Sequence, residues 1–138
     1  MRIRKFWMIF LFFVLTLSEV HAQEAAKLAS IYYWKAKPGK LEEYNRYIKS
    51  AAEPIDEEAR KVGAFISMMT FLSQQDSSAW THMRVFLLRD SVQLQNLARL
   101  LDEAAIRLER DETKRKKRSE YATTLRDFVA HEIVTILK

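Results

Sequence analysis

The fold is decided by residues Ala29–Phe71, which read ASIYYWKAKPGKLEEYNRYIKSAAEPIDEEARKVGAFISMMTF. Proline and glycine interrupt regular structure, so their positions divide this stretch into a strand, a turn, a long helix and a second strand. All prolines and glycines of the 138-residue chain fall within it, and they are Pro38, Gly39, Pro54 and Gly63.

The residues before the Pro-Gly turn are β-branched and aromatic, which predicts a strand over Ala29–Ala36. After the turn, apolar residues recur at spacings of three and four, which predicts a helix from about Lys40. Pro54 should kink this helix or begin a second segment, and Gly63 should end it with a positive φ. A second apolar strand is predicted over Ala64–Leu72.

A polar connection, Ser73–Ala79, leads to a third strand predicted over Trp80–Leu88. Asp90 is a suitable N-cap for the next helix, with Gln93 as its capping-box partner. That helix begins near Val92 and carries a leucine stripe.

The remainder, about 111–138, is predicted to be a C-terminal helical extension after a break near Asp111–Thr113. It contains the basic run Lys114–Arg118. Such a run can bind nucleic acid or another anionic surface, but the adjacent acidic segment, Glu109–Glu112, offsets its charge. We therefore expect a solvated segment and no nucleic-acid partner; the alternative is that the run binds anionic lipid or polysaccharide in the envelope.

The N-terminus has the pattern of a secretory signal peptide, with basic residues, an apolar run over Phe6–Leu17 and a cleavage site after Ala22. The apolar run covers only about 18 Å as a helix, which is short for a membrane span; an uncleaved signal anchor is the alternative. We expect one mature domain, residues 23–138, that is periplasmic or secreted and has no stable membrane anchor.

Composition bounds the chemistry of this domain. The first 22 residues contain three of the 23 basic and one of the 18 acidic residues, which leaves 20 against 17 and a mature charge of +3. The chain contains no cysteine, which excludes thiol catalysis, cysteine zinc sites, iron–sulfur clusters and a lipoprotein anchor. The length suits one domain with its own core.

The predicted strands are apolar on both faces, whereas an antiparallel sheet with one wet face alternates apolar and polar residues. Something must therefore cover the face away from the helices. We expect a second copy of the chain, hence a homodimer; the alternative is that the C-terminal helix covers this face.

The order of elements resembles the dimeric α+β-barrel families, which have a ferredoxin-like fold. The resemblance spans about Ser30 to Leu100, half of the chain. A helical pattern stands where those families have a fourth strand, so the predicted order is βαββα with an extra C-terminal helix. The families include cofactor-independent monooxygenases, haem-handling enzymes and small lyases, so the resemblance chooses no activity. The residues that carry it are Tyr32, Tyr33, Trp34, Pro38, Gly39, Lys40, Glu43, Tyr44, Gly63 and Trp80–Phe86.

Two polar residues on the third strand are the candidates for catalysis. His82 and Arg84 are expected to share a face with Trp80 and Phe86, and a pocket needs such a mixture of polar and apolar groups. His82 could act as an acid or base, and Arg84 could hold an anionic group. The alternative is a hydrogen-bonded sheet histidine, with Arg84 paired to Glu42 or Glu43.

The candidate ligand-binding residues are Tyr33, Trp34, Ser67 and Trp80. The aromatic residues of the first strand and helix could instead pack in a core or an interface. His82 and His131 lack the spacing of a metal site, so we expect neither metal nor cofactor.

These patterns suggest an exported α+β domain that binds a small, partly apolar molecule between its sheet and its helices. The alternatives are a non-catalytic envelope protein and a cofactor-independent monooxygenase- or lyase-like enzyme. Whether the protein is an enzyme stays open at this point.

Overall fold

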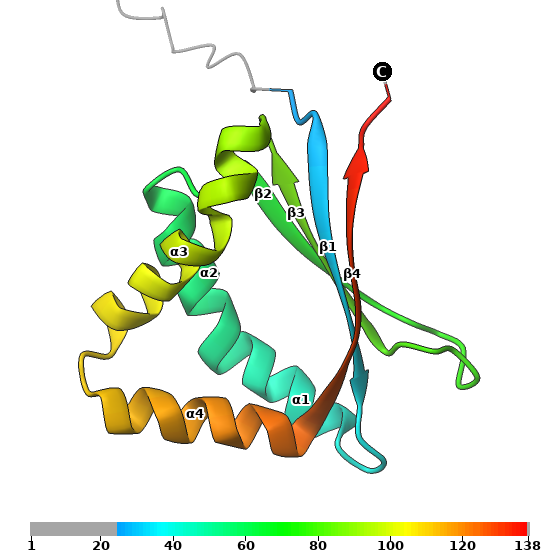
Figure 1. Cartoon of the computed structure of the whole chain (residues 1–138). Coiled ribbons are helices and arrows are strands. Elements are labelled where there is room, and N and C mark those ends of the chain that lie inside the picture. Colours follow the sequence, from blue (N-terminus) through cyan, green and yellow to red (C-terminus); the bar gives the residue numbers. More distant parts are fainter. Residues whose placement is uncertain (1–24, 138) are drawn as a thin grey trace, which may run out of the picture.

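The structure is a computed structural model that describes residues 25–137, so the predicted signal peptide, residues 1–22, lies outside the described residues. It is an α+β fold in which four α-helices, a π-helical turn and four strands form two layers (Figure 1). The elements in chain order are β1 (Leu28–Ala36), α1 (Leu41–Tyr47), a π-helical turn η1 (Ile48–Ala52), α2 (Glu53–Lys61), β2 (Ser67–Leu72), β3 (His82–Leu88), α3 (Ser91–Leu108), α4 (Glu112–Leu125) and β4 (Arg126–Thr135).

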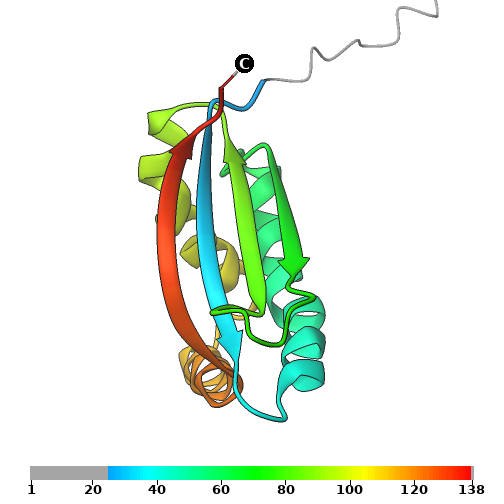
Figure 2. The ribbon, with the colours of Figure 1, turned by 90° about the vertical axis from the view of Figure 1, so that its right-hand side faces the viewer.

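The four strands form one antiparallel sheet in the order β2-β3-β1-β4. The helices lie on one face of this sheet and leave the other face open (Figures 1 and 2). This arrangement is compatible with a ferredoxin-like fold. It confirms the predicted α+β class with helices on one face.

The prediction of a C-terminal helix over 111–138 is wrong in its second half. The helix α4 ends at Leu125, and Arg126–Thr135 forms the strand β4 alongside β1. Residues 128–135 are rich in Val, Ile and Phe, which favour strands. A short apolar run fits both the helical period of 3.6 residues and the strand period of two, so the pattern alone does not distinguish them. The free edge of β1 decides in favour of the strand, because it offers a ladder of backbone hydrogen bonds. The predicted helix break is confirmed, with Asp111 as the N-cap of α4.

The residues predicted to end or begin helices and turns do so in the structure. Gly39 and Gly63 both have positive φ, at 74° and 80°, where a side chain would be strained. Pro54 lies in the first turn of α2, directly after the π-helical turn, where its missing N–H costs little. Asp90 caps α3 by accepting a hydrogen bond from the backbone N–H of Gln93, at 2.9 Å. The turn at Gly39, the end of α2 and the start of α3 therefore lie where the sequence predicts.

The two faces of the sheet differ in what they contact. On the helix face, β1 and β3 pair Ser30 with Phe86, Tyr32 with Arg84 and Trp34 with His82. On the outer face, apolar side chains prevail over the whole sheet; they are Ala29, Ile31, Tyr33, Met69, Phe71, Met83, Val85, Leu87 and Val134. No helix covers this outer face (Figure 2). The alternative in which the C-terminal helix covers it is wrong, because α4 lies on the opposite side of the sheet (Figure 1).

Candidate functional site

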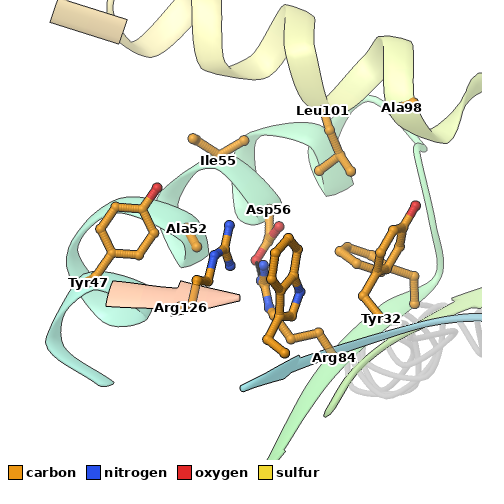
Figure 3. A pocket seen from close by; sticks show the side chains of 11 residues that line it. Tyr32, Tyr47, Ala52, Ile55, Asp56, Arg84, Ala98, Leu101 and Arg126 are labelled. Atoms are coloured by element: carbon orange, nitrogen blue, oxygen red, sulfur yellow. Dashed lines mark hydrogen bonds and ion pairs between the residues drawn. The ribbon is translucent and has the colours of Figure 1, made fainter. Parts of the chain in front are cut away.

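A pocket of about 320 Å³ lies between the sheet and the helices, and we call it the inner pocket. It receives side chains from every strand except β2 and from all helices except α4, so no single element could form it. Figure 3 shows these side chains converging from the sheet below and the helices above. The lining residues are Tyr32, Trp34, Tyr47, Ala52, Ile55, Asp56, Arg84, Phe86, Ala98, Leu101 and Arg126.

A buried ion pair forms the polar floor of the inner pocket. Arg84 on β3 donates a hydrogen bond to the carboxylate of Asp56 on α2, and the two residues are only 8% and 6% exposed. The side chains point toward one another in Figure 3. The alternative of an arginine paired with a helix carboxylate is therefore confirmed, but the carboxylate is Asp56 of α2. The prediction of Glu42 or Glu43 is wrong, because both lie on α1 and Glu43 pairs with Lys40 at 2.8 Å.

The ion pair retains unused hydrogen-bonding capacity. The Nε of Arg84 is buried and has no hydrogen-bond partner among the described residues. Burial raises the pKa of Asp56 to about 6, because lost hydration outweighs the attraction of the Arg84 guanidinium. A buried donor without a partner is costly, so Nε adds to the free-energy cost of burying this ion pair.

A second guanidinium belongs to Arg126, the first residue of β4. Its central carbon lies 3.7 Å from the centre of the Trp34 ring, which is a close cation–π contact. The same guanidinium donates a hydrogen bond to the hydroxyl of Tyr44 at 2.7 Å. Arg126 is therefore held in place and charged at the wall of the pocket. Its place in the pocket could not be predicted, because the sequence pattern predicts a helix over residues 126–135.

His82 lies on the helix face of β3 but does not line the inner pocket. Its side chain is fully buried, and a tautomer protonated at Nε2 satisfies both nitrogens, which lie 2.8 Å from Asn45 Oδ1 and 2.8 Å from the Thr81 hydroxyl. Burial, together with the positive charges of Arg126 and Arg84, lowers the pKa of His82 to about 4. His82 is therefore neutral near pH 7 and engaged on both sides, as the sheet-histidine alternative expects.

Only one of the four expected ligand-binding residues reaches the inner pocket. Trp34 lines it, whereas Tyr33 and Ser67 belong to the outer face of the sheet. Trp80 lies before β3, with its ring 5.9 Å from that of Tyr33. The expectation that Trp80 shares a face with His82 is therefore wrong. The chain has not yet entered the pleat of β3 at Trp80, so the alternation of side chains does not extend back to it.

Within residues 25–137, no group of three or more His, Cys, Asp or Glu side chains could hold a metal ion. No helix in this range is long and apolar enough to cross a membrane. No family model, curated protein or solved structure matches the chain.

Proposed function

We propose that this protein binds a small, partly apolar molecule with an anionic group in the inner pocket. The observation that carries this proposal is the pairing of aromatic and aliphatic walls with two guanidinium groups, Arg84 and Arg126, in one cavity. The volume of the inner pocket, about 320 Å³, is at the lower end of the range for ligand pockets. Asp56 neutralises one of the two positive charges, so one positive charge is left for an anion.

The walls and the guanidinium groups favour different parts of the ligand. Tyr32, Phe86 and Leu101 provide apolar surface for an aromatic or aliphatic body. Arg126 presents a planar fork of donors that suits a carboxylate or a phosphate. No nucleophile or general base is part of this proposal, so it concerns binding. A cofactor-independent enzyme remains the second candidate only if His82 gains access to a ligand.

The first prediction concerns occupancy of the inner pocket. Replacing Ala98, an exposed residue of α3 at the rim, by tryptophan should fill the pocket and abolish ligand binding. Octanoate and naphthoate are suitable probes, read out by isothermal titration calorimetry. The control is Val92→Trp on the first turn of the same helix, 61% exposed and outside the pocket lining, which should bind as wild type does. Equal affinity in Ala98→Trp and wild type would contradict the proposal, and so would the absence of binding in a panel of apolar acids.

The proposal includes a second copy of the chain on the outer face of the sheet. This face is mostly apolar, although β4 contributes Glu132 to it, and Met69 and Phe71 remain 41% and 43% exposed. A twofold partner could present the same face, which would bury both at once. Such a dimer would leave the inner pocket on the helix side of each sheet. Export with cleavage after Ala22 completes the proposal, since the N-terminal pattern fits a signal peptide.

The second prediction is that the mature chain is a dimer at micromolar concentration. The double variant Met69→Glu, Phe71→Glu should be a folded monomer, because two charges would be buried at the sheet-to-sheet contact. Light scattering coupled to size exclusion measures this, and circular dichroism checks the fold. The control is Val92→Glu, Leu108→Glu, which places two charges at exposed apolar sites of α3 and should remain a dimer. A monomeric wild-type protein would contradict the dimer.

A further inference from the structure

A second and larger hollow adjoins the inner pocket, and we call it the outer cleft. Its volume is about 970 Å³, and it runs along α4 toward the start of β4. Side chains of α3 and of the turn after β1 complete it. The lining residues are Trp34, Lys37, Tyr47, Ile55, Asp102, Ala105, Glu112, Arg115, Lys116, Arg118, Ser119, Ala122, Thr123, Arg126, Asp127 and Phe128.

The two hollows are neighbours that share part of one wall. Trp34, Tyr47, Ile55 and Arg126 line both of them. Arg126 is the only charged residue in this shared wall, and it is held there by Trp34 and by the Tyr44 hydroxyl. A ligand that fills the inner pocket therefore meets a guanidinium where it would continue into the outer cleft.

The outer cleft is positively charged. Five basic and three acidic side chains line it, which gives a formal net charge of +2. One acid, Asp127, is already paired with Lys37 at 3.6 Å. Arg115 donates to the backbone carbonyls of Glu109 and Arg110, at 2.9 Å and 2.8 Å, which positions its guanidinium without neutralising it. Within the part of the chain that the structure describes, Lys116 and Arg118 form no ion pair.

Packing does not explain why these cations are placed on α4. Only Ala122 and Leu125 of its fourteen residues are buried, so the helix has almost no apolar face. Five consecutive basic residues, Lys114–Arg118, also repel one another and weaken the helix. Three of the five, Arg115, Lys116 and Arg118, line the outer cleft, where a bound anion would offset their repulsion.

We propose that the ligand of the inner pocket is an amphipathic phosphate monoester whose phosphate lies in the outer cleft. This inference rests on the proposed function, because the apolar body occupies the inner pocket. A phosphate monoester carries a charge of about −1.5 to −2 at neutral pH, which matches the +2 of the outer cleft. A carboxylate has a single charge that Arg126 alone can match. Arg126 would bridge the two parts of the ligand, with Arg115, Lys116 and Arg118 around the phosphate.

The test compares octanol, octanoate and octyl phosphate, which share one apolar body, together with inorganic phosphate. Titration calorimetry with wild type should show octyl phosphate binding about tenfold or more tightly than octanoate, and inorganic phosphate binding far more weakly. The double variant Lys116→Gln, Arg118→Gln should lose this preference while its octanoate affinity stays unchanged. The matched control, Lys114→Gln, Lys117→Gln, removes two charges from the same helix outside the cleft lining and should retain the preference.

The outcomes separate this inference from the proposed function. Equal affinity for octyl phosphate and octanoate, or loss of the preference in both double variants, overturns the inference and leaves the inner pocket as a ligand site. Inorganic phosphate binding as tightly as octyl phosphate also overturns it. Failure of octanoate and of octyl phosphate to bind at all removes the proposed function itself.

A further arm identifies the source of the monoester. Vesicles of phosphatidylcholine with phosphatidic acid present the same phosphate on a lipid. If wild type sediments with them and octyl phosphate or Ala98→Trp prevents this, the ligand is a lipid monoester; if vesicles leave the octyl phosphate affinity unchanged, it is a soluble one. Sedimentation that Ala98→Trp does not reduce would mean contact with the membrane surface alone, which overturns the inference.

Discussion

Replacing Asp56 by alanine is expected to lower the free energy of unfolding by about 3–5 kcal/mol, the largest effect of any single change considered. The variant leaves Arg84 buried without its carboxylate, and a guanidinium cannot lose its charge to escape the cost. Urea denaturation followed by circular dichroism measures the loss. The matched control is Glu57→Ala, one residue along α2, whose exposed ion pair with Arg60 at 2.8 Å should contribute less than about 1 kcal/mol.

A double variant tests whether the loss comes from the unpaired charge. In Asp56→Leu, Arg84→Met, both charges are replaced by apolar groups, so most of the lost stability should return. Retention of the full loss would point to packing around Asp56 instead. If Asp56→Ala loses no more free energy of unfolding than Glu57→Ala does, the Arg84–Asp56 pair is solvated in the folded protein and does not form a buried floor of the pocket.

The second large effect concerns the pH dependence of stability. Asp56 and His82 contribute slopes of opposite sign, and replacing either residue should reveal the slope of the other. The pKa of Asp56 is raised by burial from 3.8 to about 6, so the folded state binds more protons than the unfolded state between these values. Stability from this group is present at low pH and is lost as pH rises through about 6. The pKa of His82 is lowered by burial from 6.5 to about 4, so its contribution is present above about 6.5 and is lost as pH falls through about 4.

Because the two windows overlap, the contributions oppose one another in wild type. In His82→Gln, stability should fall as pH rises from about 4 to about 6, and in Asp56→Asn it should rise over the same interval. Each slope can approach about 1.4 kcal/mol per pH unit, and the wild-type slope should lie between them. Urea unfolding at several pH values measures all three proteins. Parallel curves for the three proteins would show that neither group titrates as its burial indicates.

Carboxylates at or near the surface add a pH-dependent slope that all three proteins share. Hydrogen bonds and neighbouring cations lower the pKa values of several of them, so that their contributions are lost in acid. The comparison between variants cancels this background. The groups concerned are Glu43, Glu57, Glu58 and Asp90.

Much of the fold could be predicted from local signals. Gly63 marks the end of α2 because a positive φ suits glycine, and Asp90 marks the start of α3 because its side chain satisfies a backbone N–H. The apolar character of both sheet faces was also visible in the strands. These features depend on neighbours in the sequence, which a pattern can reveal.

The inner pocket was predicted only in part. Arg84 and Trp34 were found because each is a polar or aromatic residue on a recognisable strand. Asp56 was missed because its role comes from burial against Arg84, which lies 28 residues away. Arg126 was missed with the strand β4. No local pattern indicates which of several carboxylates on a helix will face the sheet and lie opposite a buried arginine.

The sequence by itself determined the α+β class, the order of the first three strands and their helices, and the positions of the turns. Only the tertiary structure decided that residues 126–135 form a strand, because the choice depends on the free edge of β1 and not on their own period. It also decided that Arg126 lies over Trp34, between the inner pocket and the outer cleft. The physical reason is the same in both cases, since hydrogen-bond ladders and cavities are formed by residues far apart in the chain.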